Sequence, residues 1–175
     1  MNESQEQKLN KYLEDCDWDS AAILDEADKP TPKVLWQRAL ALCFRDSKDH
    51  RDGKFDDAVE AATKAVAIVG DSKIEARCVR AYAYYLNGNY EQALAECKRI
   101  SAGSKRTFPR QECFVVELCG LVYDKLEDTM KAQETYSTAL GQCFNPLTTP
   151  SGANPLPSPL LMNAYRESVK RLNRK

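Results

Sequence analysis

The chain has 175 residues, of which 43 % are hydrophobic, which suits one compact domain or one short repeat array. Its 25 basic and 26 acidic side chains nearly cancel, so net charge favours neither nucleic acid nor an anionic membrane as an obligatory partner. No apolar run approaches the roughly 18 residues needed to span a bilayer, and the first residues are polar. These features predict a cytoplasmic, alternatively nuclear, protein that is not secreted and has no transmembrane segment.

Apolar residues recur at helical spacing along the chain, and no segment alternates as a strand would. In chain order they predict four helical hairpins, at about 5–28, 34–69, 74–100 and 113–141. The second hairpin has about six extra residues between Phe44 and Gly53, compared with the motif described below. We expect this insertion to lengthen the first helix of that hairpin or to bulge its turn.

Three of the predicted turns share a sequence pattern. They read Gly53-Lys-Phe-Asp-Asp-Ala-Val, Gly88-Asn-Tyr-Glu-Gln-Ala-Leu and Glu127-Asp-Thr-Met-Lys-Ala-Gln. Their alanines, Ala58, Ala93 and Ala132, are 35 and 39 residues apart. In each, a turn residue reverses the chain and the small alanine lets the second helix approach the first. The third turn departs from the pattern, because Glu127 and Thr129 replace the glycine and the aromatic residue.

This turn and its period resemble the tetratricopeptide repeat family. The resemblance covers about 5–143, with a degenerate first repeat around Asp17-Trp18-Asp19. It implies an all-α fold of antiparallel helix-turn-helix repeats, stacked as a short right-handed superhelix that binds proteins rather than acting as an enzyme.

The composition changes after Cys143, where five prolines fall within 144–160 and predict a Pro-rich linker. Residues 161–175 place Leu161, Tyr165, Val169 and Leu172 on one helical stripe, opposite a basic face. This segment is predicted to be a capping helix over the end of the array. The alternative is a basic amphipathic helix that contacts RNA or a membrane, which would be the chain's only route to either.

Chemistry typical of enzymes is missing from the sequence. The single histidine, His50, lies in a charged loop, and there is no phosphate-binding glycine loop or metal-ligand motif. We therefore predict no catalysis, no cofactor, no metal and no small-molecule substrate. The seven cysteines, an odd number without a Cys-x-x-Cys pair, predict buried thiols, with disulfides or a zinc site as the alternative.

In proteins of this family the first helices of successive hairpins line a concave groove that holds a partner's peptide or helix. The resemblance implies these groove-facing residues: Gln37, Ala41, Phe44, Arg45, Glu75, Cys78, Tyr82, Tyr85, Phe114, Glu117, Leu121 and Asp124. Tyr82 and Tyr85 are the expected anchors. The cations that some members use to bind the acidic tail of chaperones are absent, which favours an apolar peptide or a partner helix.

Three functions compete at this stage. The first is an adaptor, co-chaperone-like or active in complex assembly, that captures a protein partner in the groove. The second is a structural subunit of a ribonucleoprotein or other large assembly, similar to the signal recognition particle, with the basic C-terminal helix on RNA or membrane. The third is a homo-oligomer in which the Pro-rich tail or end helix occupies a neighbour's groove.

Overall fold

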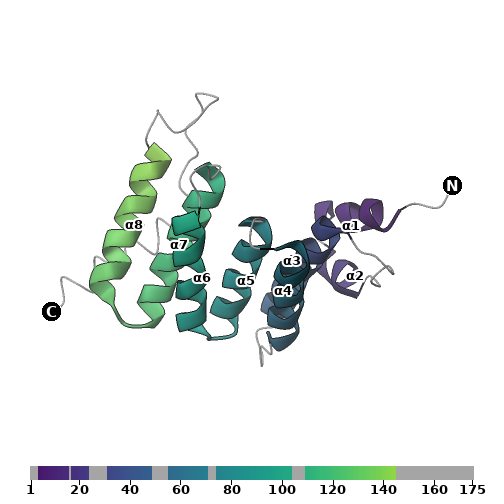
Figure 1. Cartoon of the computed structure of the whole chain (residues 1–175), viewed down its shortest axis with the longest axis horizontal. Coiled ribbons are helices and arrows are strands. Elements are labelled where there is room, and N and C mark those ends of the chain that lie inside the picture. The colour runs from purple at the N-terminus through teal and green to yellow at the C-terminus, as the bar shows by residue number, and fades with distance from the viewer. Residues whose placement is uncertain are drawn as a thin grey trace. The chain divides into compact units, whose positions relative to one another are not determined.

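The computed structural model describes residues 4–15, 17–23, 31–48, 55–70, 74–103 and 109–144. All regular secondary structure in these ranges is α-helical, as the sequence predicts (Figure 1). The helices are α1 (Gln5–Glu14), α2 (Trp18–Ile23), α3 (Pro32–Lys48), α4 (Asp56–Val69), α5 (Ile74–Leu86), α6 (Tyr90–Gly103), α7 (Pro109–Lys125) and α8 (Thr129–Phe144). The expected Pro-rich linker and C-terminal helix, within 145–175, lie outside the described residues.

The chain packs as two compact units, Met1–Ala93 and Leu94–Lys175, with the boundary inside α6. We call them unit 1 and unit 2. None of the helices in the described ranges is both long enough and apolar enough to cross a bilayer.

Short polar side chains begin four of the helices by accepting backbone N–H groups that have no partner within the helix. Ser4 and Gln7 form a reciprocal capping box at α1. Asp17 accepts the N–H of Ser20 at 3.1 Å, at the start of α2. Thr31 performs the same role for α3, and Asp128 for α8.

The α5–α6 and α7–α8 turns have the same backbone structure. Gly88 ends α5 with φ 77° and donates to the carbonyl of Tyr85, while Asn89 donates to the carbonyl of Tyr84. Glu127 ends α7 with φ 59°, and the N–H groups of residues 127 and 128 make the corresponding two bonds. This is the Schellman arrangement, which requires a left-handed residue at its centre. The turn at Glu127 therefore forms without the glycine that the pattern usually places there.

The insertion in the second hairpin extends α3. That helix continues past Phe44 to Lys48, so it includes the first of the inserted residues; its 17 residues equal α7 in length and exceed the 13 of α5. Residues 49–54, which follow, lie outside the described ranges.

Helices α1 to α5 all contribute to a hydrophobic core in unit 1. Its fully buried members are mostly alanines, at helical spacing on α4 and at the facing positions of α3 and α5. They include Ala21, Ala39, Ala41, Ala58, Ala62 and Ala83, with Leu9 and Cys43. Small side chains let the helix backbones approach closely, and larger ones such as Val34 and Leu42 fill the remaining space.

In unit 2, α7 and α8 pack side by side around the buried ring of Tyr136 (Figure 1). The ring lies directly on Gly120, where an added Cβ would overlap it. The Tyr136 hydroxyl donates to Asp124 Oδ2 at 3.0 Å, so the polar end of the ring is satisfied. Ala132 and Ala139, one turn away on either side of Tyr136, complete the contact.

Cys43, Cys78 and Cys97 are buried free thiols, which confirms the sequence prediction for these three, and Cys119 is a half-buried free thiol. The described part of the chain holds no group of three or more side chains that could ligate a metal ion.

Replacing Glu127 by glycine should stabilise the protein. A left-handed non-glycine residue costs roughly 1–2 kcal/mol, and glycine loses about 0.5–1 kcal/mol of that gain through unfolded-chain entropy. We expect the free energy of unfolding to rise by about 0.5–1 kcal/mol, measured by urea denaturation with circular dichroism. Gly88→Ala, the reverse change at the equivalent turn, should lower the free energy of unfolding. A loss of stability in Glu127→Gly, or a gain in Gly88→Ala, would contradict the left-handed backbone at these turns.

Gly120→Ala should destabilise unit 2 by about 1–3 kcal/mol, because the new methyl group must displace the Tyr136 ring. The same measurement applies. In a Tyr136→Leu background, where the ring is absent, the Gly120→Ala change should cost much less. An equal loss of stability in both backgrounds would show that the Tyr136 ring is not the reason why position 120 requires glycine.

Candidate functional site

Four aromatic rings of unit 1 lie in two pairs, one between α3 and α5 and one between α5 and α6. Phe44 of α3 and Tyr82 of α5 have ring centroids 6.2 Å apart, tilted by 51°. Tyr85, one turn further along α5, lies 6.0 Å from the ring of Tyr90 at the start of α6. All four are half-buried. We call Phe44, Tyr82, Tyr85 and Tyr90 the aromatic surface.

Helical spacing and helix packing together build the aromatic surface. Tyr82 and Tyr85 stand at i and i+3 on α5, so they share one face of that helix. The α3 and α5 helices contact each other directly, which brings Phe44 to Tyr82. Tyr90 joins the set because the tight turn at Gly88 folds the start of α6 back toward Tyr85.

Tyr82 differs from an ordinary surface tyrosine in the pKa of its phenol. Burial raises the pKa of its phenol above the ordinary value of 10.0, and the neighbouring Cys43 and Tyr85 raise it further. The ring therefore stays neutral and donates or accepts hydrogen bonds throughout the physiological pH range.

The other expected groove residues of unit 1 are placed differently. Gln37 and Cys78 are each only 8 % exposed, and Ala41 is fully buried. The Gln37 Nε2 donates to Asn10 Oδ1 of α1 at 3.3 Å. Glu75, at the start of α5, is half-buried. The accessible part of the expected set is therefore mainly aromatic, and a binding role for the buried members stays a prediction.

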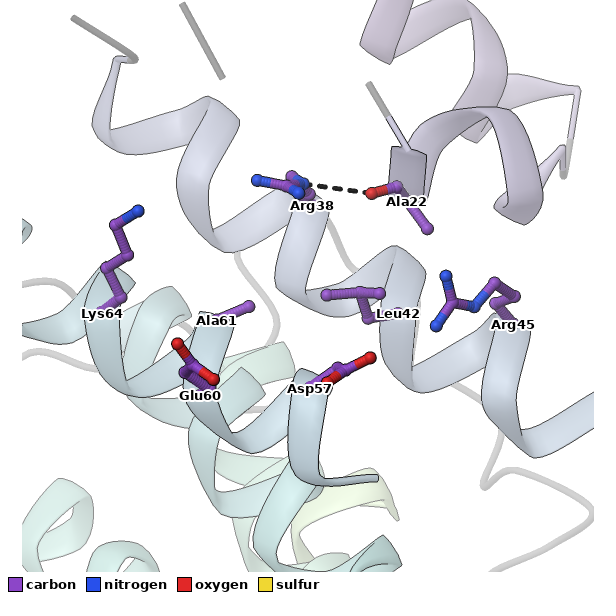
Figure 2. Close-up of a pocket in the computed structure, with 8 residues that line it drawn as sticks. All are labelled: Ala22, Arg38, Leu42, Arg45, Asp57, Glu60, Ala61 and Lys64. Atoms are coloured by element: carbon purple, nitrogen blue, oxygen red, sulfur yellow. Dashed lines mark hydrogen bonds between the residues drawn. The ribbon is translucent and has the colours of Figure 1, made fainter. Parts of the chain in front are cut away.

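Arg45 lines a separate pocket of about 320 Å³ between α2, α3 and α4. Figure 2 shows its lining side chains, which come mainly from facing helical stripes on α3 and α4. The lining residues are Ala22, Arg38, Leu42, Arg45, Asp57, Glu60, Ala61 and Lys64.

The pocket combines three cations with two carboxylates, and it is anchored at one end by a hydrogen bond. Arg38 Nε donates to the carbonyl oxygen of Ala22 at 3.1 Å, which ties α3 to the last turn of α2 (Figure 2). Sequence analysis did not single out this pocket. The sequence signal for the pocket was the i, i+4, i+7 spacing of Arg38, Leu42 and Arg45, which places these three side chains on one face of α3.

In unit 2, two of the expected groove residues, Leu121 and Asp124, take part in the α7–α8 packing. Leu121 packs on the cluster formed by Ala132, Tyr136 and Ala139, and Asp124 accepts the Tyr136 hydroxyl. Glu117 is half-buried. Phe114 belongs to α7, but its side chain lies outside the described part of the structure. Asp124 and Leu121 thus have a structural role that the sequence did not reveal.

One solved structure, named "MamA MSR-1 C2", resembles the whole chain. The TM-score is 0.63 at 16 % identity, over 97 % of this chain and 85 % of that one. MamA contains tetratricopeptide repeats. At this identity the likeness concerns the fold, and it supports the helical-repeat architecture that the sequence pattern indicates. No protein-family model matches the chain, and no curated protein does.

The raised pKa of Tyr82 predicts a loss of stability in alkaline solution. Below pH 10.0 the phenol is neutral in both the folded and the unfolded chain, and the stabilisation by the neutral ring is complete. As pH rises past 10.0, the phenol ionises first in the unfolded chain. That stabilisation is then lost as pH rises through the higher folded pKa. Urea unfolding at neutral and alkaline pH should show a smaller alkaline loss in Tyr82→Phe than in the wild type. Identical pH dependence would contradict burial of this phenol.

Proposed function

We propose that the chain is a protein-binding scaffold and that the aromatic surface of unit 1 holds an extended peptide or a helix of a partner protein. The observation that carries this proposal is the gathering of four half-buried rings from three helices, in two tilted pairs. Aromatic side chains in such sets give large contact area at low cost in conformational entropy, and they dominate the energetics of many interfaces.

The chemistry of the aromatic surface specifies the kind of peptide. Phe44 contributes an apolar ring, while Tyr82 and Tyr85 add hydroxyl groups to the same set of half-buried rings. A partner segment with two or three apolar side chains flanked by polar groups would suit this combination. The helix backbones below the rings are fixed by the alanine-rich core, so the surface needs little reorganisation on binding.

The helical-repeat architecture agrees with this role, because stacked hairpins expose long faces for recognition. Among protein-binding roles, we propose that of an adaptor that captures its partner, either as a co-chaperone would or during the assembly of a complex. The alternative of a permanent subunit in a ribonucleoprotein depends on the basic segment 161–175, which lies outside the described residues. Self-association through the Pro-rich tail depends on the same part of the chain.

Affinity capture from cell extract tests the proposal. The full chain is compared with the double variant Tyr82→Ala plus Tyr85→Ala, after circular dichroism shows that both are folded. The loss of both rings should weaken the binding of specific partners by tenfold or more, because each ring should contribute about 1 kcal/mol or more to the binding free energy. Ile68→Ala is the matched control, because this side chain is 55 % exposed on α4 of the same unit.

Two outcomes would contradict the proposal. Capture of the same proteins at equal yield by the double variant would exclude the aromatic surface as the binding site. Capture that falls steeply with added salt would instead indicate phosphate contacts, as expected for a nucleic-acid assembly, because apolar contacts respond weakly to ionic strength.

A further inference from the structure

Two cysteine thiols on neighbouring helices of unit 2 are in contact. Cys97 belongs to α6 and Cys119 to α7, and their side chains are hydrogen-bonded to each other. Neither of them forms a disulfide. They differ in access to solvent, since Cys97 is fully buried while Cys119 is half-buried. An oxidant in solution thus has better access to Cys119 than to Cys97.

We propose that Cys97 and Cys119 form a reversible disulfide when the protein meets a hydroperoxide, with Cys119 as the reacting thiol and Cys97 as the resolving thiol. The inference is independent of the protein-binding role, because it concerns different residues in the other unit.

The surroundings of Cys119 favour its thiolate, which is the form that reacts with peroxides. The hydrogen bond from Cys97 lowers the pKa of Cys119 below its ordinary value, and the nearby Lys98 lowers it further, while partial burial opposes both effects. A partly accessible thiol with a lowered pKa beside a second thiol is the arrangement typical of redox-sensitive cysteines.

The reaction balances with hydrogen peroxide as the oxidant. The Cys119 thiolate attacks one peroxide oxygen, an S–O bond forms, the O–O bond breaks, and hydroxide leaves and is protonated to water. The Cys97 sulfur then attacks the Cys119 sulfenic acid, an S–S bond forms, the S–O bond breaks, and a second water leaves. The two thiols together lose two electrons and two protons, and the peroxide is reduced to two waters.

The disulfide would connect α6 to α7, two consecutive helices that belong to different hairpins. It would close the segment between residues 97 and 119 into a covalent loop, which restricts the unfolded chain. The oxidised protein should therefore unfold at higher urea concentration than the reduced protein.

Peptide mapping of the full chain tests the proposal. Trypsin releases Cys97 in the peptide 81–98 and Cys119 in the peptide 111–125, which also contains Cys113. After treatment with hydrogen peroxide and blocking of free thiols, mass spectrometry should find these two peptides joined, two hydrogens lighter, and separated again by dithiothreitol. Fragment spectra should place the bond at Cys119, and Cys113→Ser, a matched change on the same helix, should leave it unchanged.

Two variants test the order of the steps. In Cys97→Ala, Cys119 should accumulate sulfenic acid that dimedone traps, because the resolving thiol is missing. In Cys119→Ser, neither the bond nor a dimedone adduct at Cys97 should appear. Should a variant fail to fold, the wild-type map decides alone. A Cys119 that stays reduced, proceeds to sulfinic acid without bonding Cys97, or pairs with another cysteine would overturn the proposal.

Discussion

The helices of this protein approach one another closely because very small residues stand where they cross. In unit 1 the crossing positions are buried alanines, including Ala39, Ala58 and Ala62. In unit 2 the space is even tighter, and Gly120 lies under the ring of Tyr136. Dispersion contacts decline steeply with separation, so each additional methyl group at these crossings would forfeit contacts along the whole helix pair. The aromatic surface depends on this constraint, since it exists only while α3 and α5 remain in contact.

The helices and turns could be predicted from the sequence because their signals are local. Apolar spacing marks the buried face of each helix, and a recurring turn marks where the chain reverses. The turn at Glu127 shows how strong this information is. The glycine is missing, yet the backbone adopts the same left-handed conformation as at Gly88, because the flanking helices and the N-cap at Asp128 fix the geometry.

The site was less predictable, because one residue along a helix is a rotation of about 100°. Phe44 and Arg45 are adjacent in sequence, but the Phe44 ring lies beside Tyr82, whereas Arg45 lines the charged pocket between α2, α3 and α4. Burial at Gln37 depends on α1, a contact across 27 residues that no local pattern encodes. Tyr90 belongs to the predicted turn that begins at Gly88, and its contact with Tyr85 follows from the fold of that turn rather than from helical spacing.

The pairing of Gly120 with Tyr136 also bears on how the repeats of this chain can be compared. A shift of 39 residues aligns the last two hairpins, and it places Gly120 over Ala81 and Tyr136 over Cys97. One hairpin thus combines a glycine with a large ring, and the other combines an alanine with a small thiol. In the last hairpin the glycine and the ring are in contact, so these two positions form a single coupled choice rather than two independent ones. A repeat sequence that combined the alanine of one hairpin with the tyrosine of the other would place a methyl group where the ring lies, and its two helices would have to move apart.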